Sequence, residues 1–190
     1  MVPEKPIIIK TMQASFNKLI VLLFILLCTS KGSTQMGYPI PEERGELMFY
    51  IQRNHNSNTI VYDAKFDENG QLNESEPIKV YWLRYEEQGQ KMDLRSIEKW
   101  YAYGVKSKKI KSNDNTFELK LVADDSRRFL LQQTAAFDAF VSTKINNRDS
   151  KLHHLYIYAD NSGLWPEVKY IELFGEDLLT GKDNYQRIIP

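Results

Sequence analysis

Short runs of alternating apolar and polar residues dominate the chain from Leu47 onward. Between Leu47 and Tyr85, three aromatic-rich runs are separated by two polar loops. Successive side chains of a β-strand point to opposite faces, so a period of two residues indicates strands rather than helices. This stretch predicts a three-stranded antiparallel meander, and the later runs repeat its pattern.

Later alternating runs extend the prediction to about eight strands. The intervals between them are short and rich in turn-forming residues, as in Asp67–Gly70 and Asn146–Ser150. No interval is long enough for repeated β-α-β crossovers, so we expect mainly antiparallel pairing. The predicted fold class is mainly β: an antiparallel β-sandwich or barrel of about eight strands with one short helix.

One stretch, Asp93–Ala102, predicts that short helix. Asp93 is a residue type favoured at helix N-caps, and Gly104 is common just beyond a helix end. Four apolar residues fall at positions i, i+3, i+6 and i+7 of a helix: Leu94, Ile97, Trp100 and Tyr101. A strand across Trp100–Lys106 is the competing interpretation. The lysine-rich run 105–111 predicts an exposed edge strand, because charged side chains discourage edge-to-edge pairing.

The N-terminus has the pattern of a secretory signal peptide over residues 1–34. Lys18 precedes the apolar run Leu19–Cys28, and small residues follow, with cleavage expected near Thr34. Ten apolar residues span about 15 Å as a helix, against about 30 Å of hydrocarbon, so a retained anchor is the weaker interpretation. Met12 would begin a signal peptide of more usual length, which makes residues 1–11 an over-extended start. Residues 35–46 are interpreted as a lead-in segment and 47–190 as a single β-rich domain.

Charge and cysteine content exclude several classes of function. The full chain has 25 basic and 25 acidic residues, and residues 1–34 hold four of the former and one of the latter. The remainder is mildly acidic, a poor match to the phosphate backbone of nucleic acids. The one cysteine, Cys28, lies in the signal peptide, so the mature chain is expected to be cysteine-free. We therefore expect no nucleic acid partner, no disulfide and no stable membrane span in the mature form.

Metal and cofactor sites are not expected either. His153 and His154 are adjacent, so in a strand they point to opposite faces and do not converge on one ion. Asp67, Asn69 and Gly70 resemble a fragment of a calcium loop, but ordinary turn chemistry explains the same residues. We predict no metal and no cofactor.

If the protein is an enzyme, the sequence favours a site built from carboxylate side chains. Glu118, Asp160, Glu167 and Glu172 are the candidates for a glycan-directed pair, which would need two carboxyl groups about 5–10 Å apart. The nucleophile-elbow, P-loop and dinucleotide-binding motifs are absent from the sequence. No catalytic residue is therefore assigned.

Four residues are the candidates for ligand binding: Arg53, His55, Arg84 and Trp165. The two arginines flank strands of the opening meander, where each could bind an anion or form an ordinary edge ion pair. His55 lies in the polar loop Arg53–Asn58, which core packing explains least. Trp165 lies between a turn and Pro166 and is the aromatic residue expected to be exposed.

Four segments carry a resemblance to a known family. They are FYIQRNHNSNTIVY, PIKVYWLRY, Tyr101–Gly104 and the closing VKYIELFGEDLLTG. Together they resemble a family of exported bacterial proteins defined only as a domain of unknown function, over about Leu47 to Pro190. The resemblance implies export and a β-rich domain, and it supplies no catalytic residues.

These observations favour an exported, periplasmic or extracellular β-domain without enzymatic activity. It would bind a ligand or an envelope protein whose identity the sequence leaves unknown. The alternatives are an envelope hydrolase with a carboxylate site and a barrel that carries an apolar small molecule.

Overall fold

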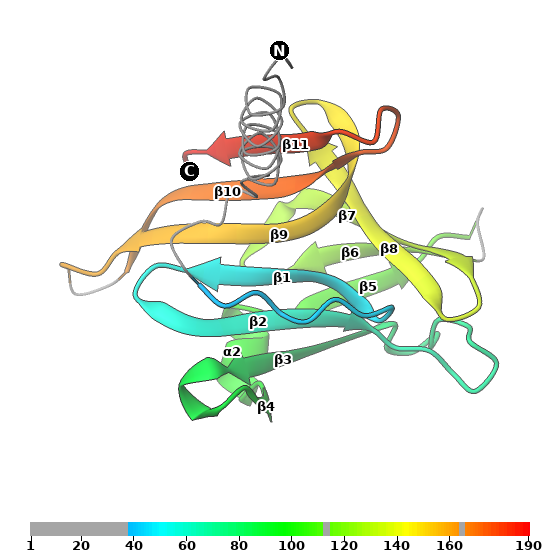
Figure 1. Ribbon diagram of the computed structural model, residues 1–190, viewed down its shortest axis with the longest axis horizontal. Coiled ribbons are helices and arrows are strands. Elements are labelled where there is room, and N and C mark those ends of the chain that lie inside the picture. Colours follow the sequence, from blue (N-terminus) through cyan, green and yellow to red (C-terminus); the bar gives the residue numbers. More distant parts are fainter. Residues whose placement is uncertain (1–37, 112–114, 164–165) are drawn as a thin grey trace, which may run out of the picture. The chain divides into compact units, whose positions relative to one another are not determined.

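The computed structural model describes residues 38–111, 115–163 and 166–190 (Figure 1). The predicted signal peptide, residues 1–34, lies outside these ranges. The described strands are β1 (Leu47–Arg53), β2 (Asn56–Ala64), β3 (Ile78–Arg84), β4 (Gln90–Asp93), β5 (Val105–Lys109), β6 (Thr116–Leu121), β7 (Asp124–Ala135), β8 (Asp138–Ile145), β9 (Arg148–Asp160), β10 (Glu167–Asp177) and β11 (Asp183–Ile188). A 3-10 turn, η1 (Tyr85–Glu87), follows β3, and the helix α2 (Ser96–Tyr101) separates β4 from β5.

The sheet forks at β9. Its first residues pair with β8, whereas His154–Ile157 pair with β1, and β10 runs along the opposite edge. The path therefore runs β4-β3-β2-β1-β9-β8-β7-β6-β5, with β10 and β11 added beside β9. We call β1–β4 the first wing and β5–β8 the second wing. The two wings curl toward each other as a half-barrel (Figure 1).

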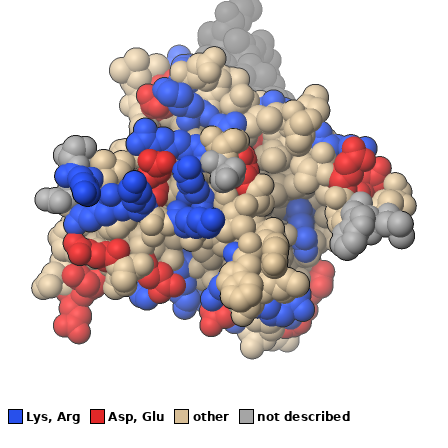
Figure 2. Space-filling model, turned by 180° about the vertical axis from the view of Figure 1, so that it is seen from behind, with Lys and Arg blue, Asp and Glu red and all other residues tan. Residues whose placement is uncertain are grey.

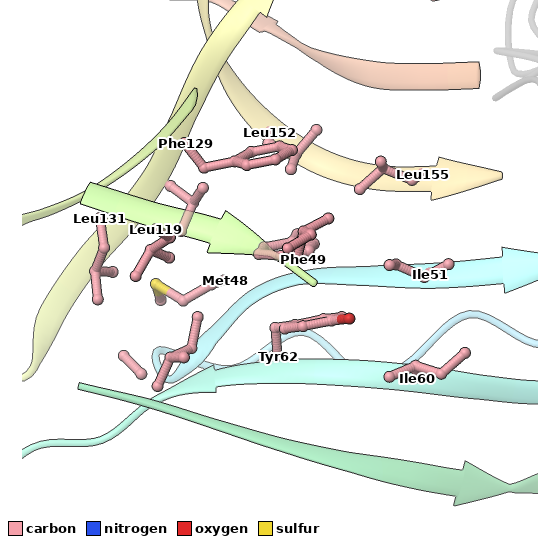
Figure 3. Close-up of a cluster of buried hydrophobic side chains, with 14 of the residues drawn as sticks. Met48, Phe49, Ile51, Ile60, Tyr62, Leu119, Phe129, Leu131, Leu152 and Leu155 are labelled. Atoms are coloured by element: carbon pink, nitrogen blue, oxygen red, sulfur yellow. The ribbon is translucent and has the colours of Figure 1, made fainter. Parts of the chain in front are cut away.

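The core fills the space between the wings (Figure 3). Phe49 of β1 stacks on Tyr62 of β2, with ring centroids 4.2 Å apart, and lies parallel to Phe129 of β7 at 6.2 Å. All three are almost fully buried, as is Leu131. Because strand side chains alternate, the inward members of each run form this core. These buried side chains form one hydrophobic cluster together with residues of both wings and of β9 and β10.

Residues 39–46 cover part of the outer face of the first wing. Nη2 of Arg44 contacts both carboxylate oxygens of Asp63, at 2.5 and 2.6 Å, and also donates to the Tyr81 hydroxyl. Nε2 of Gln52 donates to the carbonyl oxygen of Pro39 at 2.8 Å. These contacts attach the segment to β1, β2 and β3.

The predicted mainly β fold with one short helix is confirmed, but the strand count is higher. The described residues form eleven strands rather than about eight, in a curled half-barrel sheet. The unpredicted β4 has four exposed residues, so it lacks the apolar period that marks a strand. One pair, β1 with β9, is parallel: Tyr50 is opposite His154, and the chain between the two strands, residues 54–147, returns β9 in the same direction as β1. The lysine-rich edge strand is confirmed as β5, which ends the sheet path.

The helix is shorter than predicted, its predicted N-cap is wrong, and the apolar residues within it are exposed. Arg95, rather than Asp93, is the N-cap, and its backbone N–H donates to the Glu98 carboxylate at 2.8 Å. Leu94 is buried but precedes the helix, whereas the other three apolar residues point to solvent: Ile97, Trp100 and Tyr101, which are 62%, 70% and 75% exposed. Tyr103 and Trp82 occupy the core position nearby, with their rings edge to face at 5.4 Å. Helical spacing shows an apolar face but not whether a neighbour covers it.

Candidate functional site

The ends of β1, β3 and β4, the start of β2 and the helix α2 line a pocket of about 350 Å³. The strand register brings β1, β2 and β3 together at this end of the sheet, because Arg53 is opposite Asn56 and Ile60 is opposite Trp82. We call it the arginine pocket. Its lining residues are Arg53, Asn56, Asn58, Trp82, Arg84, Met92, Asp93, Arg95 and Glu98.

Aromatic rings hold the Arg53 side chain in place. Its Nη1 donates to the Tyr103 hydroxyl at 2.8 Å, and its guanidinium carbon lies 5.5 Å from the centre of the Trp82 ring. Both contacts are of the kind that favour a guanidinium over other side chains. Within the part of the chain that the structure describes, no carboxylate oxygen lies within 4 Å of this cation. Its Nε is buried and has no hydrogen-bond partner.

A second buried polar group without a partner lines the same pocket. Asn58 is only 8% exposed, and its side-chain oxygen accepts no hydrogen bond. Its own backbone N–H donates to Oδ1 of Asn56 at 2.9 Å, which fixes the start of β2. Buried polar atoms are normally satisfied, so these two atoms mark a place for a ligand or water.

The other arginines of the pocket have acidic partners. Arg84 pairs with Glu87 at 2.7 Å, and Arg95 pairs with Glu98 at 2.8 Å. Burial opposes ionisation of Glu98, but hydrogen bonds from Arg95 and Trp82 outweigh it and lower the Glu98 pKa. Asp93 is exposed at the rim, where water screens its charge. Arg53 therefore supplies the unbalanced positive charge in the interior of the pocket.

A neighbouring pocket of about 410 Å³ shares Arg53 and Asn56 with the arginine pocket and is also lined by His55. Asn54 fixes this loop to β9, since its side chain donates to the Ala159 carbonyl at 2.7 Å and accepts from the Ala159 N–H at 2.8 Å. His55 is exposed and has a left-handed backbone, with φ of 59°. Pro166 lines this second pocket as well.

The four residues predicted from the sequence thus divide between two pockets. Arg53 and Arg84 line the arginine pocket, Arg53 and His55 line its neighbour, and Trp165 lies outside the described residues. The sequence did not single out Asn58, because an asparagine in a polar loop has the appearance of an ordinary turn residue. Glu98 was also missed, since its role depends on the short helix returning to the end of β3.

The other candidates from the sequence have structural partners. His154 lies stacked between Tyr50 and Phe174, with centroids 5.0 and 4.2 Å away, while His153 is exposed. The Asp67 carboxylate accepts the N–H groups of Asn69 and Gln71, both at 2.9 Å, which is turn chemistry. Among the described residues, no cluster of three or more His, Cys, Asp or Glu is placed to hold a metal ion.

The carboxylates proposed for an enzyme lie in different settings. Glu118 pairs with Arg128 at 3.3 Å, and Asp160 faces Glu167 in the exposed register of β9 and β10. Glu172 is buried and accepts hydrogen bonds from Arg187 at 2.7 Å and Tyr185 at 2.5 Å. These hydrogen bonds join β10 to β11, so Glu172 has a structural role.

The fold and the pocket define a class of protein: a mainly β domain with a small basic pocket at the end of one wing. The chain belongs to a family defined as a domain of unknown function (DUF4833), whose model matches residues 49–187. This confirms the resemblance seen in the sequence. Searches of curated proteins and of solved structures found no match. In the described ranges no helix has the length and apolar character needed to cross a membrane.

Proposed function

We propose that this protein is an exported, non-enzymatic binding domain whose arginine pocket takes a small hydroxylated carboxylate, such as a sugar acid. The observation that carries the proposal is the guanidinium of Arg53, which is partly buried and has no acidic partner among the described residues. A buried charge is costly unless it is paired. A carboxylate on the ligand would supply the pair and form a charge-assisted hydrogen bond.

The neighbouring groups favour a hydroxyl beside that carboxylate. The free side-chain oxygen of Asn58 needs a donor, which a hydroxyl group provides and a simple carboxylate does not. The volume of about 350 Å³ is at the small end of the range for ligand pockets. This suits a ligand about the size of one sugar ring.

Binding without catalysis is supported by the state of the acidic groups. A general acid or base must be free to reach the substrate. The carboxylate of Glu98 is already engaged by Arg95 and by Nε1 of Trp82, at 2.8 and 3.4 Å. Asp93, at the exposed rim, is the other acid that lines the pocket.

Isothermal titration calorimetry of the purified protein with glucuronate, glucose and acetate tests the proposal. We expect glucuronate to bind more tightly than either glucose or acetate, because it alone offers both functional groups. Arg53→Gln should abolish glucuronate binding. Arg128→Gln is the matched control, since Arg128 lies on the second wing and pairs with Glu118 at an exposed position. Equal binding of glucuronate by the wild type and the Arg53 variant would contradict the proposal.

Export is supported by the signal-peptide pattern of residues 1–34. Expression of the full chain followed by cell fractionation and N-terminal sequencing tests it. We expect a periplasmic or extracellular product that begins near Gln35. A product that keeps residues 19–28 would show a retained N-terminal segment instead.

A further inference from the structure

Two open strand edges border a groove at the mouth of the half-barrel. β4 pairs with β3 only at Tyr81–Arg84, so Ile78–Val80 have no strand on that side. β5 pairs only with β6 and ends the sheet. The groove between these edges has a volume of about 650 Å³ and is lined by residues of both.

The backbone of β5 directs its free groups into this groove. The carbonyl of Gly104 accepts from the Val122 N–H, and the Ile110 N–H donates to Thr116, so even-numbered residues face β6. Hydrogen bonding alternates along an antiparallel strand, which leaves the N–H and C=O groups of Val105 and Ser107 on the open side. Both residues line the groove.

The same argument applies to β3. The carbonyl of Pro77 accepts from Lys65 on the β2 side, whereas that of Arg84 accepts from Gly89 on the β4 side. Alternation then directs the N–H and C=O groups of Ile78 and Val80 to the open side. The groove is thus bordered on both sides by unpaired strand backbone.

Basic side chains surround the groove. Lys65, Lys79, Lys99 and Lys106 line it, against Glu76 and Asp93. Glu76 is already paired with Lys65 at 2.6 Å. Figure 2 shows Lys and Arg side chains gathered over the strands of the second wing on this side of the molecule. Trp100, which is 70% exposed, lines the groove beside them.

We propose that the groove binds an extended, acidic peptide segment of a partner protein as an added strand between β3 and β5. The unpaired edges supply the backbone hydrogen bonds, which is how a peptide adds to an exposed sheet edge. The lysines select acidic side chains on the peptide, and Trp100 covers its apolar ones. This groove adjoins the arginine pocket at Asp93, which lines both, but Arg53 does not line the groove.

The probe is an acetylated eight-residue peptide that alternates Glu with Thr and Val, titrated into the purified protein by calorimetry. Two peptide controls isolate the interactions: one with every Glu replaced by Lys, and one N-methylated at alternate residues to remove backbone donors. We expect the acidic peptide to bind and both controls to fail. Hydrogen exchange should slow at the amides of Val105 and Ser107 when the peptide is bound.

Variants of the protein complete the test. Lys99→Glu combined with Lys106→Glu should weaken binding by roughly tenfold, since each change replaces an attraction to the acidic peptide with a repulsion. Lys182→Glu, in the exposed turn between β10 and β11, should bind as the wild type does. Ser107→Pro removes an outward N–H while keeping the bonds to β6, and it should also weaken binding.

Three results would overturn the proposal. The first is the absence of binding at millimolar peptide, and the second is binding that leaves exchange at Val105 and Ser107 unchanged. The third is protection of those amides without peptide, together with a dimer in analytical ultracentrifugation, which would assign the edges to a second copy of this chain.

Discussion

The Tyr103 hydroxyl accepts a 2.8 Å hydrogen bond from Nη1 of Arg53, across 50 residues of chain. The backbone carbonyl of Tyr103 in turn accepts from the Tyr62 hydroxyl at 3.0 Å, so the ring is fixed to the core. Through this pair, the core determines where the cation of the arginine pocket lies. A rigid cation needs less ordering when a ligand binds, which favours affinity.

Replacing Tyr103 with Phe should lower the free energy of unfolding by about 1 kcal/mol, because a partly buried hydrogen bond is lost. It should also weaken glucuronate binding, since Arg53 is no longer held in place. Tyr101→Phe is the matched control, as Tyr101 is 75% exposed, and it should change neither quantity. Urea unfolding and calorimetry measure both effects, and equal losses in the two variants would contradict the assignment.

Removing the ion pair of Arg44 and Asp63 should reduce stability more than removing the Tyr103 hydroxyl does. The Asp63 side chain is 13% exposed and accepts from Arg44 and from Tyr81 at 2.8 Å. Asp63→Ala leaves the guanidinium without its partner in a partly buried site, so we expect a loss of about 2–4 kcal/mol.

Asp149 provides the comparison for this pair. It pairs with Lys144 at 3.0 Å, but the two side chains are 64% and 70% exposed. Asp149→Ala should therefore cost less than about 1 kcal/mol in urea unfolding. Comparable losses at Asp63 and Asp149 would show that residues 39–46 contribute little to the stability of the first wing.

We expect close backbone packing around Gly175 to limit substitution at this position of β10. A Cβ there would lie 2.2 Å from the carbonyl oxygen of Lys151 and 2.9 Å from Cδ1 of Ile145. Gly175→Ala should destabilise the protein by about 1–3 kcal/mol or more, since a well-packed backbone must move. Gly45→Ala should be nearly neutral, because its nearest neighbour is 3.6 Å away. Thermal unfolding of both variants tests the contrast.

The alternation of apolar and polar residues identified most strands of this fold, because within a strand it shows which side chains are buried. The run Thr116–Leu121 shows this, with Phe117, Leu119 and Leu121 all buried. The exposed strand β4 could not be found in that way, since backbone pairing with β3 alone defines it. The parallel pairing of β1 with β9 depends on contacts far apart in the chain, for which a period of two residues has no signal.

The candidate site also combines features that the local sequence shows with features that depend on tertiary contacts. Arg53 and Arg84 were singled out because each ends or flanks a strand of the opening meander, where a basic residue can bind an anion or form an edge ion pair. Their convergence with Asn58 depends on the strand register and on the return of α2, which are tertiary facts. The exposure of the apolar residues of α2 could not be predicted for a related reason: helical spacing identifies apolar residues, whereas their burial depends on what lies opposite.

We expect the buried side chain of His154 to make the free energy of unfolding depend on pH under acidic conditions. Burial between the rings of Tyr50 and Phe174, followed by repulsion from His153, lowers the pKa of His154 to about 4, and Glu172 opposes the shift. Unfolded histidine has a pKa of about 6.5, so between pH 6.5 and 4 the unfolded state binds more protons. This contribution is therefore complete above pH 6.5 and is lost as the pH falls toward 4.

Substitution of His154 by Phe tests this pH dependence, because it keeps an aromatic ring in the stack and removes the titrating group. Urea unfolding at pH 7, 5.5 and 4.5 should show a steep loss of stability in the wild type and a flatter profile in the variant. His55→Asn, at an exposed position, should retain the wild-type slope. Parallel profiles for wild type and His154→Phe would assign the acid sensitivity to other groups. The stacked imidazole would then take up its proton over the same pH range in the folded and the unfolded protein.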